Sequence, residues 1–126
     1  MLAEAIKREA NRLKCKYRTD DPYEICKALR IRILEMPMGT GEKSCKGFFL
    51  VNARCKVITI NSDLPDHIQR IIVTHELGHA VLHRHAAISA FHDFAMFDDT
   101  DRMEYEANVF AAEFLLEDAE VTESLE

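Results

Sequence analysis

Residues 75–79 read His-Glu-Leu-Gly-His, which places two imidazoles four residues apart with a carboxylate directly after the first. On an α-helix, four residues rise about 6 Å and turn about 400°, so His75 and His79 project from one face and can share one ion. Neutral imidazole nitrogens suit Zn²⁺. Glu76 lies about 100° around the helix, where it can accept a proton from an attacking water instead of binding the metal. The pattern predicts hydrolytic metal chemistry, with His75 and His79 as ligands and Glu76 as general base.

A catalytic zinc needs a third protein ligand and one open position, and the C-terminal third of the chain supplies carboxylates for this role. Glu106 falls on an acidic stripe that is typical of a solvated helix face. Glu104 shares a helical face with residues whose small side chains would allow close helix packing: Ala107, Asn108 and Ala111. Asp101 and Glu104 also have the spacing of a capping box, which is the structural alternative for Glu104. We expect Glu104 to be the third metal ligand and keep Glu106 as the alternative.

Two further histidines follow the first pair. His83 repeats the four-residue spacing after His79, but no glutamate follows His79 to act as a base. His85 stands ten residues after His75, where metzincins place a third histidine. That pattern requires glycine at the position of Leu82 to turn the chain, so with Leu82 we expect the helix to continue. As an alternative, His83 or His85 could close the coordination shell of a structural metal.

Two helices must position these residues. A capping segment, residues 61–63, and Pro65 in the first turn predict a helix over about residues 64–84, whose apolar stripe runs into the histidines. Gly78 costs an interior helix up to about 1 kcal/mol relative to alanine, so we expect another backbone to approach it closely. Apolar periodicity predicts a last helix over about residues 101–118.

The remaining sequence predicts a basic amphipathic helix over residues 2–17, and a second helix capped by Asp21 with Pro22 at its first position. A strand follows at 31–36. A β-hairpin is expected from segments 47–51 and 55–60 with a three-residue connection. The fold class is therefore α+β, with a small antiparallel sheet packed against helices in one domain, residues 1–126.

Composition narrows the class of protein. The 126 residues are 48% hydrophobic with a net charge of −6, which argues against direct nucleic-acid binding. The first helix is basic and the last third is acidic, a polarity that we interpret as solvated faces in preference to a docking surface. The sequence contains no apolar run long enough for a membrane span and no signal-peptide pattern. Its four cysteines form no metal or redox pair, so we expect a cytoplasmic protein with free, mostly buried thiols.

Residues 104–112 read Glu-Tyr-Glu-Ala-Asn-Val-Phe-Ala-Ala. Together with the motif at residues 75–79, this segment resembles the paired signature of the ImmA/IrrE family of metallopeptidases. The resemblance implies a zincin-like minimal peptidase core with His75 and His79 as zinc ligands, Glu76 as catalytic base and Glu104 as third ligand. It also implies a protein substrate such as the helix-turn-helix repressor of a phage or mobile element.

Two functions follow from these expectations. The first is a zinc endopeptidase that cleaves a partner repressor, with His75, His79 and Glu104 as metal ligands. The second is a regulatory module in which a closed metal site is structural and the domain binds its partner without cleaving it. An open metal position beside Glu76 would distinguish the first from the second.

Overall fold

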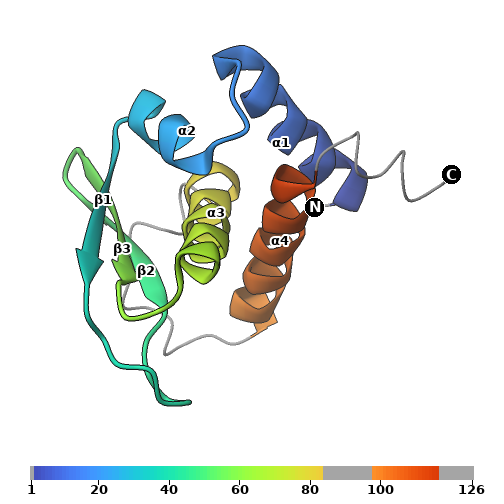
Figure 1. Ribbon diagram of the computed structural model, residues 1–126. Coiled ribbons are helices and arrows are strands. Elements are labelled where there is room, and N and C mark those ends of the chain that lie inside the picture. The colour runs from blue at the N-terminus through green and yellow to red at the C-terminus, as the bar shows by residue number, and fades with distance from the viewer. Residues whose placement is uncertain (1, 84–97, 117–126) are drawn as a thin grey trace, which may run out of the picture.

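The computed structural model describes residues 2–83 and 98–116. The elements, in chain order, are α1 (Ala3–Tyr17), α2 (Pro22–Ala28), β1 (Ile31–Met36), β2 (Gly47–Asn52), β3 (Cys55–Asn61), α3 (Asp66–Leu82) and α4 (Asp98–Leu115). Figure 1 shows α3 between the sheet and α4, with α1 and α2 together at one end of this helix pair. The expected α+β class is confirmed, and α3 and α4 are the two elements that carry the candidate site.

The first two helices form where their sequences predict them. Ile6, Ala10 and Leu13 recur at helical spacing along α1, and all three are buried. The Asp21 side chain accepts a hydrogen bond from the backbone N–H of Tyr23 at 2.9 Å, which caps α2, and Pro22 occupies its first turn. A fixed φ and a missing N–H suit proline to that position.

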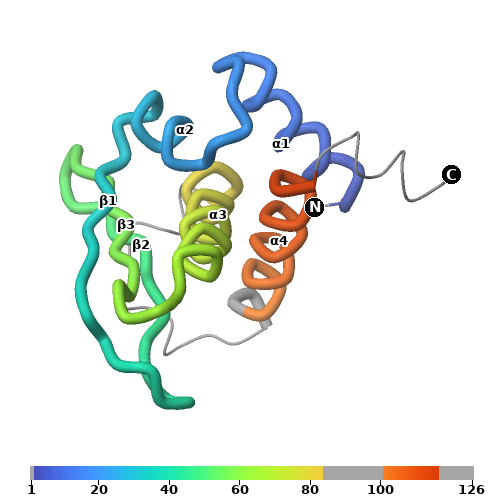
Figure 2. Tube along the Cα trace, in the orientation of Figure 1, coloured from blue at the N-terminus to red at the C-terminus, as the bar shows by residue number. Residues whose placement is uncertain are grey.

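The sheet is mixed, so the expectation of an antiparallel sheet is wrong for one of its two pairings. The strand order is β1-β3-β2, with β3 antiparallel to β2 and parallel to β1. The ten residues 37–46 carry the chain from β1, at one edge, to β2 at the other edge (Figure 2). Alternating apolar residues mark a strand but do not specify its partner, so no local pattern indicated the parallel pairing of β1 with β3.

The hairpin connection is one residue shorter than expected. Asn52 pairs with Cys55, so only Ala53 and Arg54 lie between the strands. Ala53 has φ +56°, the left-handed conformation that two-residue hairpin turns need at their first position. The expected three-residue connection is therefore corrected to two.

Both ends of α3 differ from the expectation. Pro65 is the N-cap of α3. Asn61 does not cap the helix, because its Oδ1 accepts hydrogen bonds from the N–H groups of Met38, in the 37–46 segment, and of Asp63. At the other end the helix stops at Leu82, although leucine was expected to extend it. His83 leaves the helical conformation with φ −123° while its N–H still donates to the His79 carbonyl.

The last helix starts earlier than expected, at Asp98, so Asp101 lies inside it. A capping role for Asp101 and Glu104 is excluded because a cap stands at the first turn. At the C-terminal end, Lys14 of α1 donates a hydrogen bond from Nζ to the carbonyl of Phe114 at 2.9 Å. A side chain of the basic first helix thus contacts the C-terminal end of the acidic last helix, where cations are favoured.

One core joins the sheet to the helices. Among its fully buried side chains are Ile25, Ile58, Leu77, Phe110 and Phe114. All four cysteines are free, as expected, but only Cys26 is buried. Cys15 and Cys55 are exposed on α1 and β3, and Cys45 is exposed in the 37–46 segment. Within residues 2–83 and 98–116, none of the helices combines the length and hydrophobicity that a transmembrane span requires.

Candidate metal centre

Three side chains from α3 and α4 meet at one point. His75 and His79 lie one turn apart on α3, with ring centroids separated by 4.8 Å. Their Nε2 atoms lie 2.7 Å and 3.3 Å from the same oxygen, Oε2 of Glu104 on α4. One ligand atom from each residue falls within 4.8 Å of the others, a grouping that could hold a metal ion. The structure thus brings together the residues that the sequence nominated from segments 29 positions apart.

Gly78 lets the two helices approach, but through a different contact from the one expected. A Cβ placed on Gly78 would lie 3.1–3.2 Å from atoms of the Phe110 ring and its Cβ. The expectation of another backbone against Gly78 is therefore corrected. A buried aromatic side chain fills the space, and the packing of Phe110 on Gly78 sets the distance between α3 and α4 near the site.

The two carboxylates of the site, Glu104 and Glu76, have pKa values that are shifted in opposite directions. Hydrogen bonds to His75 and His79 hold the pKa of Glu104 well below its usual range. Burial opposes the protonation of His75, but the hydrogen bond to Glu104 and the charge of Glu76 outweigh it and raise the His75 pKa. Burial also raises the pKa of Glu76, against the opposing effect of His79 and His75. Glu104 is thus a fixed anion, whereas Glu76 has the raised proton affinity that suits a general base.

Glu106 does not lie on a solvated face, contrary to the sequence expectation. It is buried, and its Oε1 lies 2.8 Å from Nε2 of His83. The sequence carried a signal for this burial, because Glu106 shares the apolar stripe of α4 that also contains Met103, Phe110 and Phe114. Glu104, not Glu106, is the carboxylate that approaches His75 and His79.

His83 is not positioned as a fourth ligand. Its Nδ1 lies 3.0 Å from Nδ1 of His79, and its Nε2 faces Glu106, so both ring nitrogens are directed away from Glu104. Burial lowers the His83 pKa, which keeps the ring neutral near pH 7. The other candidate for closing the shell, His85, lies outside the described residues.

An apolar groove of about 670 Å³ begins at the site and follows the α3–α4 interface. Its lining includes His75, Glu76 and Asn108 together with apolar residues such as Leu64 and Leu115. Ile71, which is 46% exposed, belongs to the wall. Concave apolar surface beside a few polar groups is typical of a ligand site. Sequence reasoning did not find this groove, because its walls come from three separate segments.

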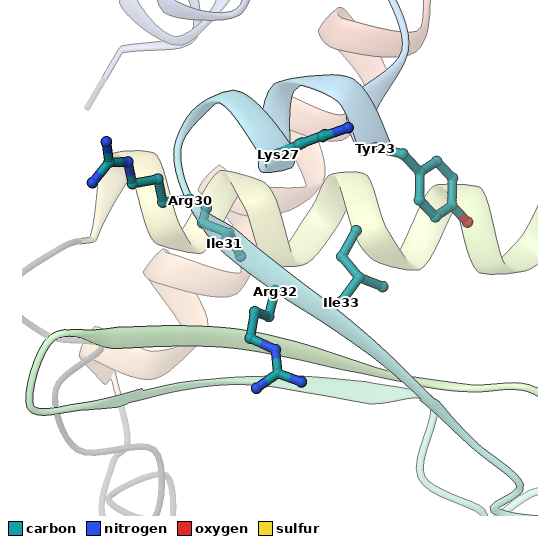
Figure 3. Close-up of a pocket in the computed structure, with 6 residues that line it drawn as sticks. All are labelled: Tyr23, Lys27, Arg30, Ile31, Arg32 and Ile33. Carbon is teal, nitrogen blue, oxygen red and sulfur yellow. The ribbon is translucent and has the colours of Figure 1, made fainter.

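The polar side chains around a second hollow, between α2 and β1, do not point toward a common centre. Tyr23, Lys27, Arg30 and Arg32 line it together with two isoleucines. In Figure 3, Arg30 and Arg32 point in different directions, and Lys27 extends toward Tyr23. Because these cations do not converge on one point, we assign no function to this hollow.

Two histidines and one carboxylate gathered on a pair of helices, with a second glutamate beside them, define a metal-dependent hydrolase type of site. The profile of the IrrE N-terminal-like domain family matches residues 26–126. Immunity region protein 2 of Bacillus phage phi105 is 36% identical over 113 residues, which cover 90% of this chain and 69% of that protein. Metallopeptidase ImmA of Bacillus subtilis (strain 168) is 27% identical over 127 residues, covering 98% of this chain and 70% of that protein. The chain therefore belongs to the ImmA/IrrE family of metallopeptidases.

Proposed function

We propose that this protein is a zinc endopeptidase in which His75, His79 and Glu104 hold the metal. The observation that carries the proposal is the approach of both Nε2 atoms to one carboxylate oxygen, with all three ligand atoms within 4.8 Å. Two neutral imidazoles and one carboxylate fit Zn²⁺, and three protein ligands leave a position for water or substrate. When bound there, Zn²⁺ would polarise the scissile carbonyl and make a water more acidic.

Glu76 has the general-base role in this proposal. It follows His75 directly on α3, is only 9% exposed, and has a raised pKa because of burial. A carboxylate with such a pKa accepts a proton from the attacking water and passes it to the leaving amine. Glu104 is the poorer proton acceptor, because hydrogen bonds from His75 and His79 hold its pKa well below its usual range, and in this proposal it is a metal ligand.

We further propose that the substrate is a protein, namely a helix-turn-helix repressor of a phage or mobile element. The family membership and the phage immunity relative support this class of partner. The groove that leaves the site between α3 and α4 could accept an apolar side chain next to the scissile bond. In this proposal the domain, residues 1–126, acts in the cytoplasm, where such a repressor works, and contacts DNA only through it.

The test uses the Glu76→Gln variant. Wild-type protein and variant are co-expressed with the repressor encoded beside the gene, and each purified protein is assayed for bound zinc. We expect equal zinc content and a loss of cleavage of at least about 10²-fold, since a general base contributes about that much. Glu42→Gln, an exposed carboxylate change in the 37–46 segment, is the matched control and should cleave normally.

Two results would contradict the proposal. Cleavage by Glu76→Gln at the wild-type rate would remove the assigned base. Tight binding of the repressor without cleavage by the zinc-loaded wild type would instead favour the regulatory module, in which the metal is structural.

A further inference from the structure

A second polar network lies on the side of His79 away from Glu104. His79 Nδ1 is 3.0 Å from His83 Nδ1, and His83 Nε2 is 2.8 Å from Glu106 Oε1. The two side chains that extend this network, His83 and Glu106, are each only 8% exposed. A buried carboxylate is costly unless it is hydrogen-bonded or paired, and His83 is one of the partners of Glu106.

Counting protons along the network assigns both ring nitrogens of His83 and Nδ1 of His79. An ionised carboxylate only accepts hydrogen bonds, so Nε2 of His83 must carry the proton that it donates to Glu106. A neutral His83 ring then has a bare Nδ1, which accepts a hydrogen bond from Nδ1–H of His79. The remaining nitrogen of His79, Nε2, faces Glu104. It donates its proton to that carboxylate when no metal is bound, and it is the nitrogen left to bind a metal.

We propose that His83 and Glu106 are positioning residues that hold the His79 ring in the tautomer and orientation required of a metal ligand. The inference rests on the proposed role of His79 in the metal centre. Carboxylate partners of ligating histidines fix the ring and raise its basicity, and their loss typically weakens metal binding about 10–100-fold. In this protein the carboxylate acts through an intervening imidazole.

The backbone geometry supports a fixed arrangement of the network. His83 is the C-cap of α3, and its N–H remains bonded to the His79 carbonyl at 2.9 Å while its φ and ψ leave the helix. Glu106 lies on the buried stripe of α4, two residues after Glu104. The same pair of helices therefore holds the metal-facing carboxylate and the carboxylate behind His79.

The experiment measures Zn²⁺ affinity of the full chain by competition with a chromophoric chelator, together with circular dichroism to verify the fold. Glu106→Leu should weaken Zn²⁺ binding about 10–100-fold. Glu106→Gln should restore affinity to within about threefold of wild type, because its amide oxygen can still accept from His83. Glu113→Leu removes a carboxylate two turns further along α4 and serves as the matched control, with unchanged affinity expected.

A spectroscopic reading of the unaltered chain makes the test independent of any folding defect. Long-range ¹H–¹⁵N correlation spectra should show His83 protonated at Nε2 and bare at Nδ1, with and without Zn²⁺. A His83 ring protonated at Nδ1, or wild-type Zn²⁺ affinity in a folded Glu106→Leu variant, would overturn the positioning role alone. Failure of the wild-type chain to bind Zn²⁺ would instead contradict the proposed metal centre itself.

Discussion

The Asn61 side chain attaches the 37–46 segment, which precedes the hairpin, to the end of the sheet. Removal of this side chain is the most informative test of stability. Asn61 is fully buried at the end of the central strand β3. Its Oδ1 accepts from the N–H groups of Met38 and Asp63, both at 2.9 Å. Its Nδ2 donates to the carbonyls of Gly39 and Cys45 at 2.7 and 2.9 Å.

The expected cost of Asn61→Ala follows from these four bonds. A net intramolecular hydrogen bond contributes about 0.5–1.5 kcal/mol, so four contribute about 4 kcal/mol. Gly39 and Cys45 lie in exposed positions, where their freed carbonyls can bind water, which reduces the expected loss to about 3 kcal/mol. Against a total stability of about 5–15 kcal/mol, a change of this size is readily measured.

Asn61→Asp sharpens the test because it keeps the shape and the two accepted bonds. The introduced carboxylate would place an oxygen, instead of an N–H donor, against the carbonyls of Gly39 and Cys45. At pH 8 we expect at least as large a loss as for alanine, with partial recovery at pH 4 when the new carboxyl is protonated.

The assay is urea unfolding followed by circular dichroism. Asn52→Ala, at the exposed end of β2, is the control and should change the unfolding free energy by less than about 0.5 kcal/mol. A loss below about 1 kcal/mol for Asn61→Ala, or an Asn61→Asp variant more stable than Asn61→Ala at pH 8, would refute the reasoning.

Two further predictions concern the helices. Lys14→Met should lower the unfolding free energy by about 1 kcal/mol, because Nζ donates to the Phe114 carbonyl at the C-terminal end of α4; an equal loss for the exposed Lys16→Met would contradict this role. Burial raises the pKa of the Cys26 thiol from 9.0 to about 12, so its contribution to stability is complete below pH 9 and is lost as pH rises toward 12. Urea unfolding at pH 8 and 10 should show wild type losing about 1.4 kcal/mol more than Cys26→Ala over that interval, and equal losses would argue against a buried neutral thiol.

What the sequence determined by itself lies within a few residues along the chain. Apolar spacing marked α1 and α3, Asp21 marked the start of α2, and the four-residue spacing of His75 and His79 required both imidazoles on one helical face. These features could be predicted because a helix repeats every 3.6 residues, so spacing alone sets direction. The helical face that Glu104 shares with Ala107, Asn108 and Ala111 favoured it as the third ligand, and the family signature implied the same residue.

Tertiary structure alone decided which distant groups meet. β1 pairs parallel with β3 because the 37–46 segment crosses the sheet, and no local pattern encodes that crossing. Glu106 was assigned to solvent from its acidic neighbours, yet α4 turns it toward His83. Spacing within one helix gives a residue's direction but not what the facing helix presents, and that depends on the packing of Phe110 against Gly78. The histidine motif could therefore be recognised in the sequence. The groove beside it and the contact of Glu106 with His83 could be found only in the folded structure.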